Sequence, residues 1–222
     1  MISVSLDPEL QARCPRVALG CVSAEVETQA TSPGVEQELR ACEEKILKLP
    51  EPKAVLESAA IEATRKSYKA LGKDPARYRG SAEALLRRIL AGKGLPRINN
   101  VVDVINVASV ESRLPIGLYD LQHIQGGIVF RAGRAGETYK GIGKYDLNLE
   151  GLPIFCDALG PHGSPTSDSE RTMVTETTTR VLGIVVSFGG SQALAQAVER
   201  LVALLATHAS SKDVERAMVG AG

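Results

Sequence analysis

Hydrophobic positions recur along this chain with two spacings, and each spacing predicts a different kind of element. Near residue 200 the apolar positions follow the i, i+4, i+7, i+8, i+11 pattern of one helix face, which predicts an amphipathic helix through Leu194, Val198, Leu201, Val202 and Leu205. Two continuous apolar runs, at 16–22 and 181–188, predict buried strands instead.

Further helices are predicted where apolar residues alternate with charged ones between proline and glycine breaks. We expect them at 33–49, at 53–71, from an N-capping Ser81 to about Gly92, and from Asn99 or Asn100 to 112. From 114 to 186, frequent Gly and Pro separate short β-prone runs. The pattern therefore predicts a mixed α/β (α+β) domain, with helices flanking a mixed sheet.

Composition narrows the class of protein. The 222 residues are 44% apolar and 23% charged, and no apolar run reaches the ~18 residues of a membrane span. The first residues lack the features of a secretory signal, and four scattered cysteines with three histidines predict neither a zinc site nor a disulfide framework. We therefore expect a cytoplasmic, reduced protein without a metal or cofactor.

Charge is balanced overall at 26 basic and 26 acidic residues, but it is unevenly distributed. Residues 65–97 contain ten basic side chains and only two acidic ones. Such a segment is typical of a surface that binds a polyanion, although a solvated helix face would look the same. The candidate nucleic-acid contacts are Arg79, Arg87, Arg88 and Lys93.

Two segments carry polar residues where the local pattern does not call for them. In the apolar helix predicted at 99–112, Asn99, Asp103 and Asn106 form one stripe, with Asn100 beside it. Buried polar groups need partners, which here would be either backbone groups or a ligand.

The second segment is 160–172, where His162, Ser167, Asp168 and Glu170 lie among hydroxyl side chains after a Gly/Pro turn. An exposed loop of this kind often binds substrates, and a surface turn before a Thr-rich edge strand is the alternative. The chain shows no GxSxG elbow, P-loop or GxGxxG motif. The residues alone therefore predict a pocket for a small polar ligand and no particular reaction.

The same two segments resemble the B3/B4 domain, the editing module of the bacterial phenylalanyl-tRNA synthetase beta chain. The segment 100–106 is similar to the family's N-x-V-V-D-V-T-N, and 114–120 is similar to its Q-P-L-H-A-F-D. The similarity continues through 126–131, Gly136-Glu137 and 170–182. It covers about residues 80–190 and implies three parts: strand and helices at 1–79, an editing core at 80–190, and a helix and tail at 191–222.

This resemblance implies hydrolysis of the ester that joins a wrong amino acid to the terminal ribose of a tRNA. Glu170 matches the glutamate that reads the substrate side chain, and Asn106 matches the helix asparagine. The family's pocket arginine falls beside Arg97, and its pocket histidine falls at Gly117, so the family's tyrosine specificity is not implied.

We expect a freestanding deacylase that acts on mischarged tRNA in trans. A tRNA- or amino-acid-binding module without hydrolytic activity is the first alternative, and a scaffold that docks another protein is the second.

Overall fold

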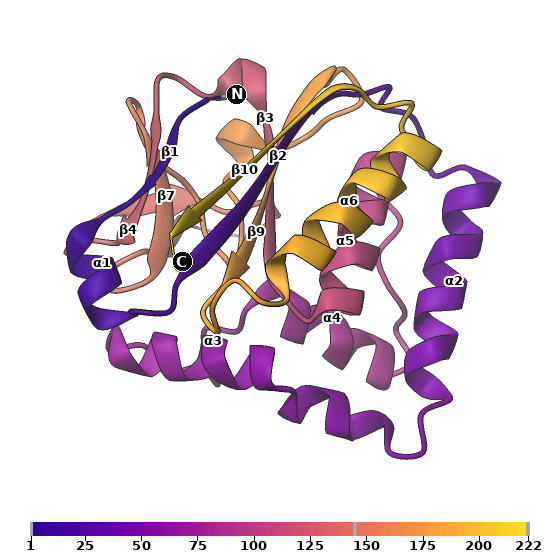
Figure 1. Ribbon diagram of the computed structural model, residues 1–222, viewed down its shortest axis with the longest axis horizontal. Helices are drawn as coiled ribbons and strands as arrows, with labels where there is room; N and C mark the ends of the chain where they lie inside the picture. The colour runs from indigo at the N-terminus through magenta and orange to yellow at the C-terminus, as the bar shows by residue number, and fades with distance from the viewer. Residues whose placement is uncertain (1, 144–145, 221–222) are drawn as a thin grey trace.

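A computed structural model describes residues 2–143 and 146–220, and its centre is a pair of stacked four-stranded sheets (Figure 1). The inner sheet has the order β10 (Lys212–Gly220), β2 (Ala18–Glu25), β9 (Arg180–Ser187), β3 (Ile116–Asp120), and all its neighbours are antiparallel. The outer sheet has the order β1 (Val4–Leu6), β4 (Ile128–Ala132), β7 (Pro153–Asp157), β8 (Gly160–Gly163). A small hairpin, β5 (Thr138–Lys140) with β6 (Asp146–Asn148), projects beside it.

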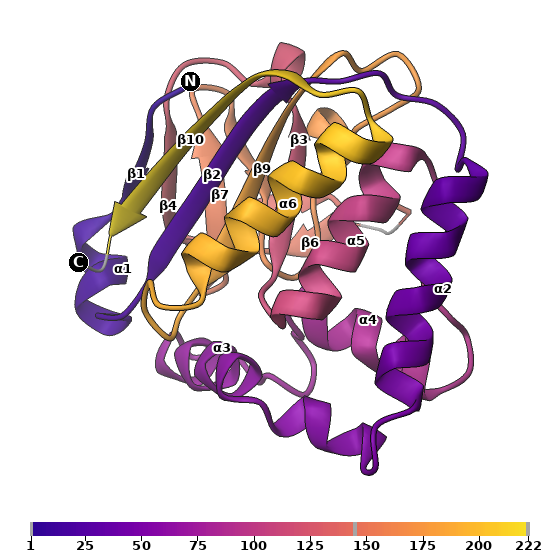
Figure 2. The ribbon, with the colours of Figure 1, turned by 45° about the vertical axis from the view of Figure 1, so that its right-hand side comes forward.

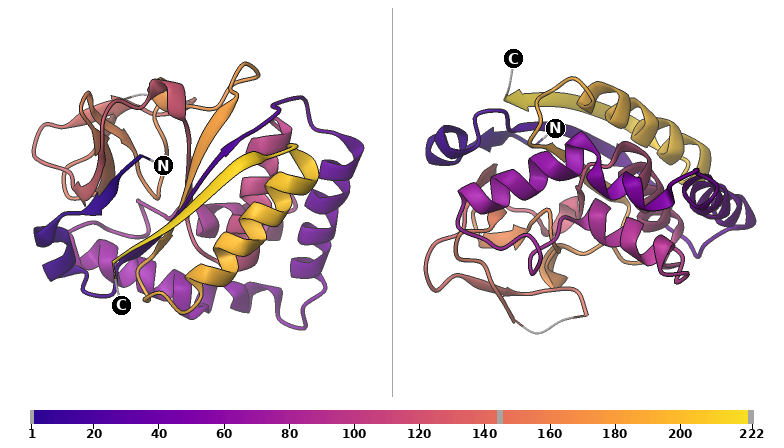
Figure 3. Two further views of the ribbon diagram at one scale, coloured as in Figure 1. Left: turned by 45° about the horizontal axis from the view of Figure 1, so that its top comes forward. Right: turned by 90° about the horizontal axis from the view of Figure 1, so that it is seen from below.

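Helices cover the face of the inner sheet that the outer sheet leaves free (Figure 2). Helices α5 (Asn100–Ser112) and α6 (Leu194–His208) pack directly on it, and α2 (Pro33–Leu47) and α4 (Ser81–Leu90) pack against α5. Two further helices, α1 (Pro8–Arg13) and α3 (Ala59–Ala70), lie toward one end of the sheets, and α3 crosses that end when the molecule is seen from below (Figure 3). Short 3₁₀ turns occupy Pro52–Glu57, Leu121–His123 and Glu170–Thr172.

The inner sheet has a hydrophobic core on each face, and its central strand β9 contributes side chains to both. Its side chains alternate between the two faces, as a strand period of two requires. Val181 and Val185 belong to the core shared with the helices, whereas Leu182, Ile184 and Val186 belong to the core between the sheets. The predicted continuous apolar run is therefore a strand that is buried on both faces.

The mixed α/β fold class is confirmed, with helices flanking sheets in one domain. Strands from all three predicted segments share the inner sheet, because β2, β9 and β10 are neighbours. No helix within the described residues is long and apolar enough to cross a membrane.

Several boundaries differ from the prediction for local reasons. The predicted helix at 53–71 is divided at Ser58, whose backbone is extended, into a 3₁₀ turn and α3. Ser81 is not the N-cap of α4: Gly80 takes that place, and the buried Ser81 hydroxyl has no hydrogen-bond partner within the described residues. The segment after α6, which we expected to be a tail, forms the strand β10.

Candidate functional site

The serine-rich segment after β8 is a packed loop, and its prediction as an exposed loop is wrong. His162, Ser164, Ser169 and Thr172 are all buried. The Ser164 hydroxyl donates to the Ser167 carbonyl at 2.8 Å and accepts the Ser167 amide at 3.1 Å, so one side chain satisfies both backbone groups of Ser167. Neither a surface turn nor a Thr-rich edge strand forms here.

Neighbouring elements hold this loop from several sides. Tyr139 of β5 donates to the Ser167 carbonyl at 2.5 Å, and Tyr68 of α3 shares a 2.8 Å hydrogen bond with Thr166. The first amide of α4, that of Ser81, donates to the Pro165 carbonyl at 2.7 Å. These contacts fix the backbone that presents Asp168.

Asp168 lies against β3, an edge strand whose outward amides are free of the ladder. One carboxylate oxygen accepts the Tyr119 hydroxyl at 3.0 Å, and the other accepts the Leu118 amide at 3.3 Å. Burial outweighs these hydrogen bonds and raises the pKa of Asp168 from 3.8 to about 7. A carboxyl group in this range can both accept and release a proton near neutral pH, as general acid–base groups in active sites do.

Tyr119 fills the space beside this carboxyl group. A Cβ atom at Gly117 would lie 2.2 Å from the Tyr119 hydroxyl oxygen, and one at Gly163 would lie 2.3 Å from it. Gly117 and Tyr119 lie two residues apart on one face of β3, so the phenol folds back over the glycine. In this packing, no side chain other than hydrogen fits at position 117.

His162 adds an uncharged ring to these side chains, and we call Asp168, Tyr119 and His162 the Asp168 cluster. It packs edge-on against Tyr119, with ring centroids 4.6 Å apart, and neither ring nitrogen has a hydrogen-bond partner within the described residues. Burial lowers the pKa of His162 to about 4. The ring is therefore neutral at physiological pH, and its role in this packing is to support the Tyr119 ring.

Glu170 lies next to the Asp168 cluster and is partly exposed to solvent. It opens the 3₁₀ turn after Asp168, retains 36% side-chain exposure and pairs with Lys140 at 2.9 Å. The neighbouring Arg171 is turned the other way and bridges to Asp157 at 2.9 Å. Asp168 and Glu170 are thus two half-buried carboxyl groups, two residues apart; Asp168 is hydrogen-bonded to β3, and Glu170 is paired with an exposed lysine.

The polar stripe of α5 divides into structural and available groups. Asn100 is fully buried; its side chain accepts the Gln29 amide and donates to the carbonyls of Glu27 and His208, each at 2.8 Å. Asp103 is equally buried and accepts the Thr31 hydroxyl at 2.6 Å and the Ile98 amide at 2.9 Å, while burial raises its pKa.

Asn106 differs from both, because it is half-buried and its side chain makes no hydrogen bond to any residue that the structure describes. Of the predicted stripe, this amide is the one free to bind a ligand.

The predicted cationic residues lie outside the Asp168 cluster. Arg97 pairs with two carboxylates of α2, Glu36 at 3.0 Å and Glu43 at 2.7 Å, and its guanidinium helps to lower the pKa of Glu36 to about 2. Arg79 and Arg87 both approach the buried Glu83, at 3.9 and 2.8 Å.

The other two predicted cations lie at the end of α4. Arg88 donates to the Gly94 carbonyl at 3.1 Å, and Lys93 is exposed.

Three tyrosines organise the site and were not among the predicted residues: Tyr68, Tyr119 and Tyr139. A usable signal existed for one of them. Gly117 and Tyr119 alternate on a β-prone run, and a glycine two residues from a large aromatic side chain indicates that the aromatic ring lies over it. The other two are set by tertiary packing and leave no local signal.

Comparison with known proteins shows which family shares this sequence and fold. The family model described as the B3/4 domain matches residues 63–219, which contain both α5 and the Asp168 loop. The phenylalanine–tRNA ligase beta subunit of Bifidobacterium longum is 29% identical over 133 residues, covering 59% of this chain and 14% of that protein. Its counterpart in Bradyrhizobium diazoefficiens is 30% identical over 84 residues, covering 38% of this chain and 10% of that protein.

Among solved structures, an N-terminal fragment of the phenylalanyl-tRNA synthetase beta subunit from Pyrococcus horikoshii shares the fold. It aligns with a TM-score of 0.51 at 16% identity, covering 98% of this chain and 50% of that one. The chain therefore spans half or less of the proteins it resembles. With a family model matching most of its length, the chain belongs to the B3/4 domain family.

Proposed function

We propose that this protein is an aminoacyl-tRNA deacylase that hydrolyses the ester of mischarged tRNA in trans. The observation that carries the proposal is the carboxyl group of Asp168, whose pKa burial raises to about 7 next to the edge of β3. Similarity to phenylalanine–tRNA ligase beta subunits supplies the substrate class.

The chemistry needs few groups because an aminoacyl ester is already activated. In the proposed step, the Asp168 carboxylate takes a proton from water as the water oxygen bonds to the ester carbonyl carbon. The bond from that carbon to the ribose oxygen then breaks, and the proton passes to the departing ribose oxygen. Orientation of the water and of the ester supplies the remainder of the rate.

Two further residues have assigned roles in this proposal. The unpaired amide of Asn106 donates to or accepts from the bound aminoacyl group. Glu170, exposed enough to exchange its partner Lys140 for a ligand, reads a polar group on the amino acid. A site that binds such a group rejects amino acids lacking it by up to about 10⁴–10⁵-fold.

One observation favours a second candidate, a binding module without hydrolytic activity. The Tyr119 hydroxyl occupies the space that any side chain at position 117 would need. The B3/B4 family that the sequence resembles has a histidine at this position. Because Tyr119 fills that space here, a protein that binds its ligand next to Glu170 without hydrolysing it is the second candidate.

Deacylation of a panel of mischarged tRNAs tests the proposal. We expect the parent to hydrolyse some members, Asp168→Asn to lose most of that rate, and Glu170→Gln to change the ranking of amino acids. The matched control is Glu176→Gln, an exposed glutamate in the same region. A folded parent that binds tRNA and hydrolyses no member of the panel would refute the deacylase and support the binding module without hydrolytic activity. Unchanged rates and ranking in Glu170→Gln would remove Glu170 from substrate recognition.

A further inference from the structure

The hydroxyl group of Tyr119 lies in a slot between two glycines. Gly117 belongs to β3 and Gly163 to β8, and a Cβ atom at these positions would lie 2.2 and 2.3 Å from the phenol oxygen. Tyr119 itself is fully buried, and its hydroxyl donates to Oδ1 of Asp168 at 3.0 Å. Two strands from different sheets thus lack a side chain at the point where this hydroxyl meets one carboxyl oxygen.

The packing of the core does not require this hydroxyl. Tyr119 and Phe155 pack edge-on with ring centroids 5.8 Å apart, and Phe130 stacks on Phe155 at 4.3 Å. A phenylalanine ring at position 119 would fill the same space without the cost of burying a polar group. The Q-P-L-H-A-F-D motif that resembles 114–120 has phenylalanine at the position of Tyr119 and histidine at that of Gly117. In this chain the polar group of this pair is therefore the Tyr119 hydroxyl.

Asp168 keeps part of its acceptor capacity for other partners. A carboxylate offers about four lone-pair sites, two on each oxygen. The Tyr119 hydroxyl takes one site on Oδ1, and the Leu118 amide, at 3.3 Å, takes one on Oδ2. Asp168 is half-buried, so part of the residue is open to solvent. Because both oxygens are held by one strand, the free lone pairs keep a fixed direction, as a general base requires.

The Tyr119 hydroxyl is the one side-chain donor, within the described residues, among the groups that set the proton affinity of Asp168. Burial raises the pKa of Asp168, and hydrogen bonds from the Leu118 amide, the Tyr119 hydroxyl and the Ser164 amide lower it. Burial, together with the nearby charge of Asp168, raises the pKa of Tyr119 well above 10, so the phenol stays protonated. It can therefore donate to the carboxylate throughout the range in which Asp168 titrates.

Four other titratable side chains that pack around the loop are uncharged near neutral pH. Burial raises the pKa of Tyr68 on α3 and of Tyr139 on β5, and it raises that of Cys156 on β7 to about 11. Burial lowers the pKa of His162 on β8 to about 4. None of these groups gains or loses a charge near neutral pH, so none masks the titration of Asp168.

The charged side chains next to the loop pair with each other instead of with Asp168. Lys140 lies 2.9 Å from Glu170, and Arg171 lies 2.9 Å from Asp157. No cation in the part of the chain that the structure describes forms an ion pair with Asp168. The hydroxyl of Tyr119 is thus the side-chain group best placed to stabilise the charged form of Asp168.

We propose that Tyr119 is a positioning residue, whose hydroxyl holds one oxygen of Asp168 against β3 and stabilises the carboxylate that accepts a proton from water. The use of this carboxylate as a base rests on the proposed function. The hydrogen bond and the glycine slot are independent of it.

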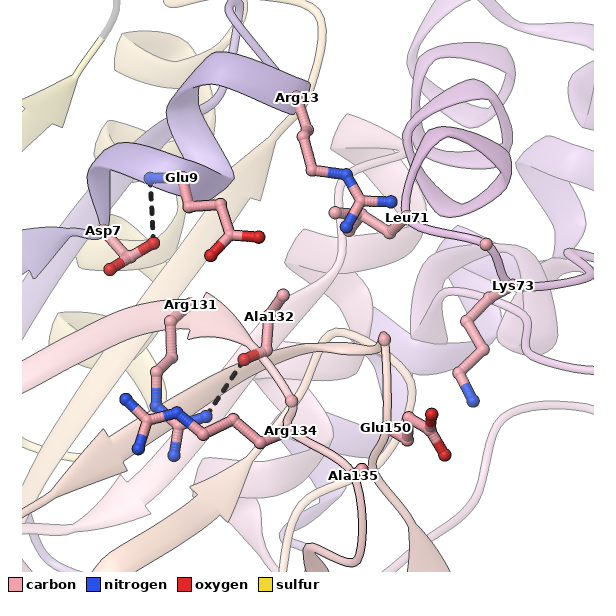
Figure 4. A pocket seen from close by; sticks show the side chains of 13 residues that line it. Asp7, Glu9, Arg13, Leu71, Lys73, Arg131, Ala132, Arg134, Ala135 and Glu150 are labelled. Atoms are coloured by element: carbon pink, nitrogen blue, oxygen red, sulfur yellow. Dashed lines mark hydrogen bonds between the residues drawn. The ribbon is translucent and has the colours of Figure 1, made fainter.

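An open pocket of about 620 Å³ shows a contrasting environment for a carboxyl group (Figure 4). It lies between α1 and the turns after β4 and β6, and Glu9 and Glu150 line it together with Lys73 and Arg134. Both glutamates are exposed, so water stabilises their charge without a positioned donor. Glu150 therefore provides a control carboxyl group outside the candidate site.

The titration of Asp168 tests the hydrogen bond without reference to activity. Its carboxyl carbon is followed by NMR in protein labelled with ¹³C-aspartate, and Asp168→Asn identifies the signal. We expect Tyr119→Phe to raise the pKa of Asp168 by about 1, because one hydrogen bond to the charged form is lost. The matched control is Tyr139→Phe, which removes another buried hydroxyl that bonds the loop backbone. It should leave the pKa of Asp168 unchanged.

A second measurement changes the hydroxyl without removing it. Fluorine at the 3-position of tyrosine makes the phenol a stronger hydrogen-bond donor. Protein made with 3-fluorotyrosine should therefore show a lower pKa of Asp168, and Tyr139→Phe with the same label should respond as the parent does. This measurement gives a result even where Tyr119→Phe does not fold.

Deacylation of mischarged tRNA between pH 5.5 and 8.5, with the spontaneous rate subtracted, tests the role in the reaction. Only the ionised carboxylate accepts a proton. A pKa raised from about 7 to about 8 therefore lowers kcat about fivefold at pH 7 and less than about 1.5-fold at pH 8.5. KM should stay unchanged, because Tyr119 acts through Asp168. Tyr139→Phe and Glu150→Gln should keep the parental pH profile.

The results separate this inference from the proposed function. A pKa of Asp168 that neither Tyr119→Phe nor 3-fluorotyrosine moves would overturn the positioning role, whatever the activity. A shifted pKa with the parental pH profile of hydrolysis would also overturn it, because the Asp168 carboxylate would then not be the base. A shifted pKa in a protein that hydrolyses no member of the panel would uphold the hydrogen bond and refute the deacylase.

Discussion

Replacing Asp168 by Asn should stabilise the folded protein relative to the parent, and this gain in unfolding free energy should increase as the pH rises. In the folded chain the pKa of this carboxyl group is raised from 3.8 to about 7 by burial. The folded state therefore binds the proton more tightly than the unfolded state does. The stability that this group contributes is fully present below pH 3.8 and is lost as the pH rises through about 7.

The size of the effect follows from the shift. A displacement from 3.8 to about 7 corresponds to at most about 4 kcal/mol of unfolding free energy at pH 8, of which roughly 2–3 kcal/mol develops between pH 5 and pH 8. Asparagine resembles the protonated acid: its oxygen can accept the Leu118 amide and its NH₂ can donate to the Tyr119 hydroxyl. The variant therefore removes the cost of ionisation while it retains both hydrogen bonds.

Urea unfolding of the parent and of Asp168→Asn at pH 5, 6, 7 and 8 gives the required free energies. We expect the advantage of the variant to grow with pH. Carboxylates whose pKa is lowered by arginines, such as Glu83 and Glu137, act on both proteins equally and cancel in the difference. Asp213→Asn, at an exposed position, is the matched control for the loss of one carboxylate. A flat difference for Asp168→Asn would refute the burial of its charge.

Three other predictions test the packing and the proposed site. Asn100→Ala should cost about 3 kcal/mol, because it removes the three hydrogen bonds of a fully buried side chain, and the urea midpoint reports it. Gly117→Ala should cost about 1–3 kcal/mol by overpacking against the Tyr119 hydroxyl, and adding Tyr119→Phe should restore part of the melting temperature. Asn106→Ala should lower deacylation about tenfold, the loss of one hydrogen bond worth roughly 1.5 kcal/mol; normal turnover in a less stable variant would assign it a structural role.

The elements with strong local patterns were predictable, and those that depend on distant partners were not. Helix α2 begins one residue after Ser32, its N-cap, and ends before Pro50, so the sequence marks both ends. Strand β10 is half-exposed and rich in charge, and it exists because β2 offers it a free edge. Its short-range pattern could not indicate that pairing.

The candidate site shows the same division. Asp103 and Asn100 were correctly expected to need partners, since they interrupt an apolar helix, and those partners proved to be groups within the chain itself, chiefly backbone. The loop at 164–169 was expected to be exposed because it is rich in serine. The hydroxyls of Ser164 and Thr166 instead bond to the loop backbone and to tyrosines, which polar composition cannot distinguish from solvation.

The pairing of β10 with β2 has a consequence for how the chain reaches this structure. It joins residues 18–25 to residues 212–220, from opposite ends of the described chain. Contacts between such distant segments slow folding, because most of the chain must be ordered before they form. On the ribosome, β2 leaves early and lacks its neighbour β10 until synthesis has passed residue 220. During that interval one side of β2 is an unpaired edge, and chaperones that cover such edges would be needed most at this stage.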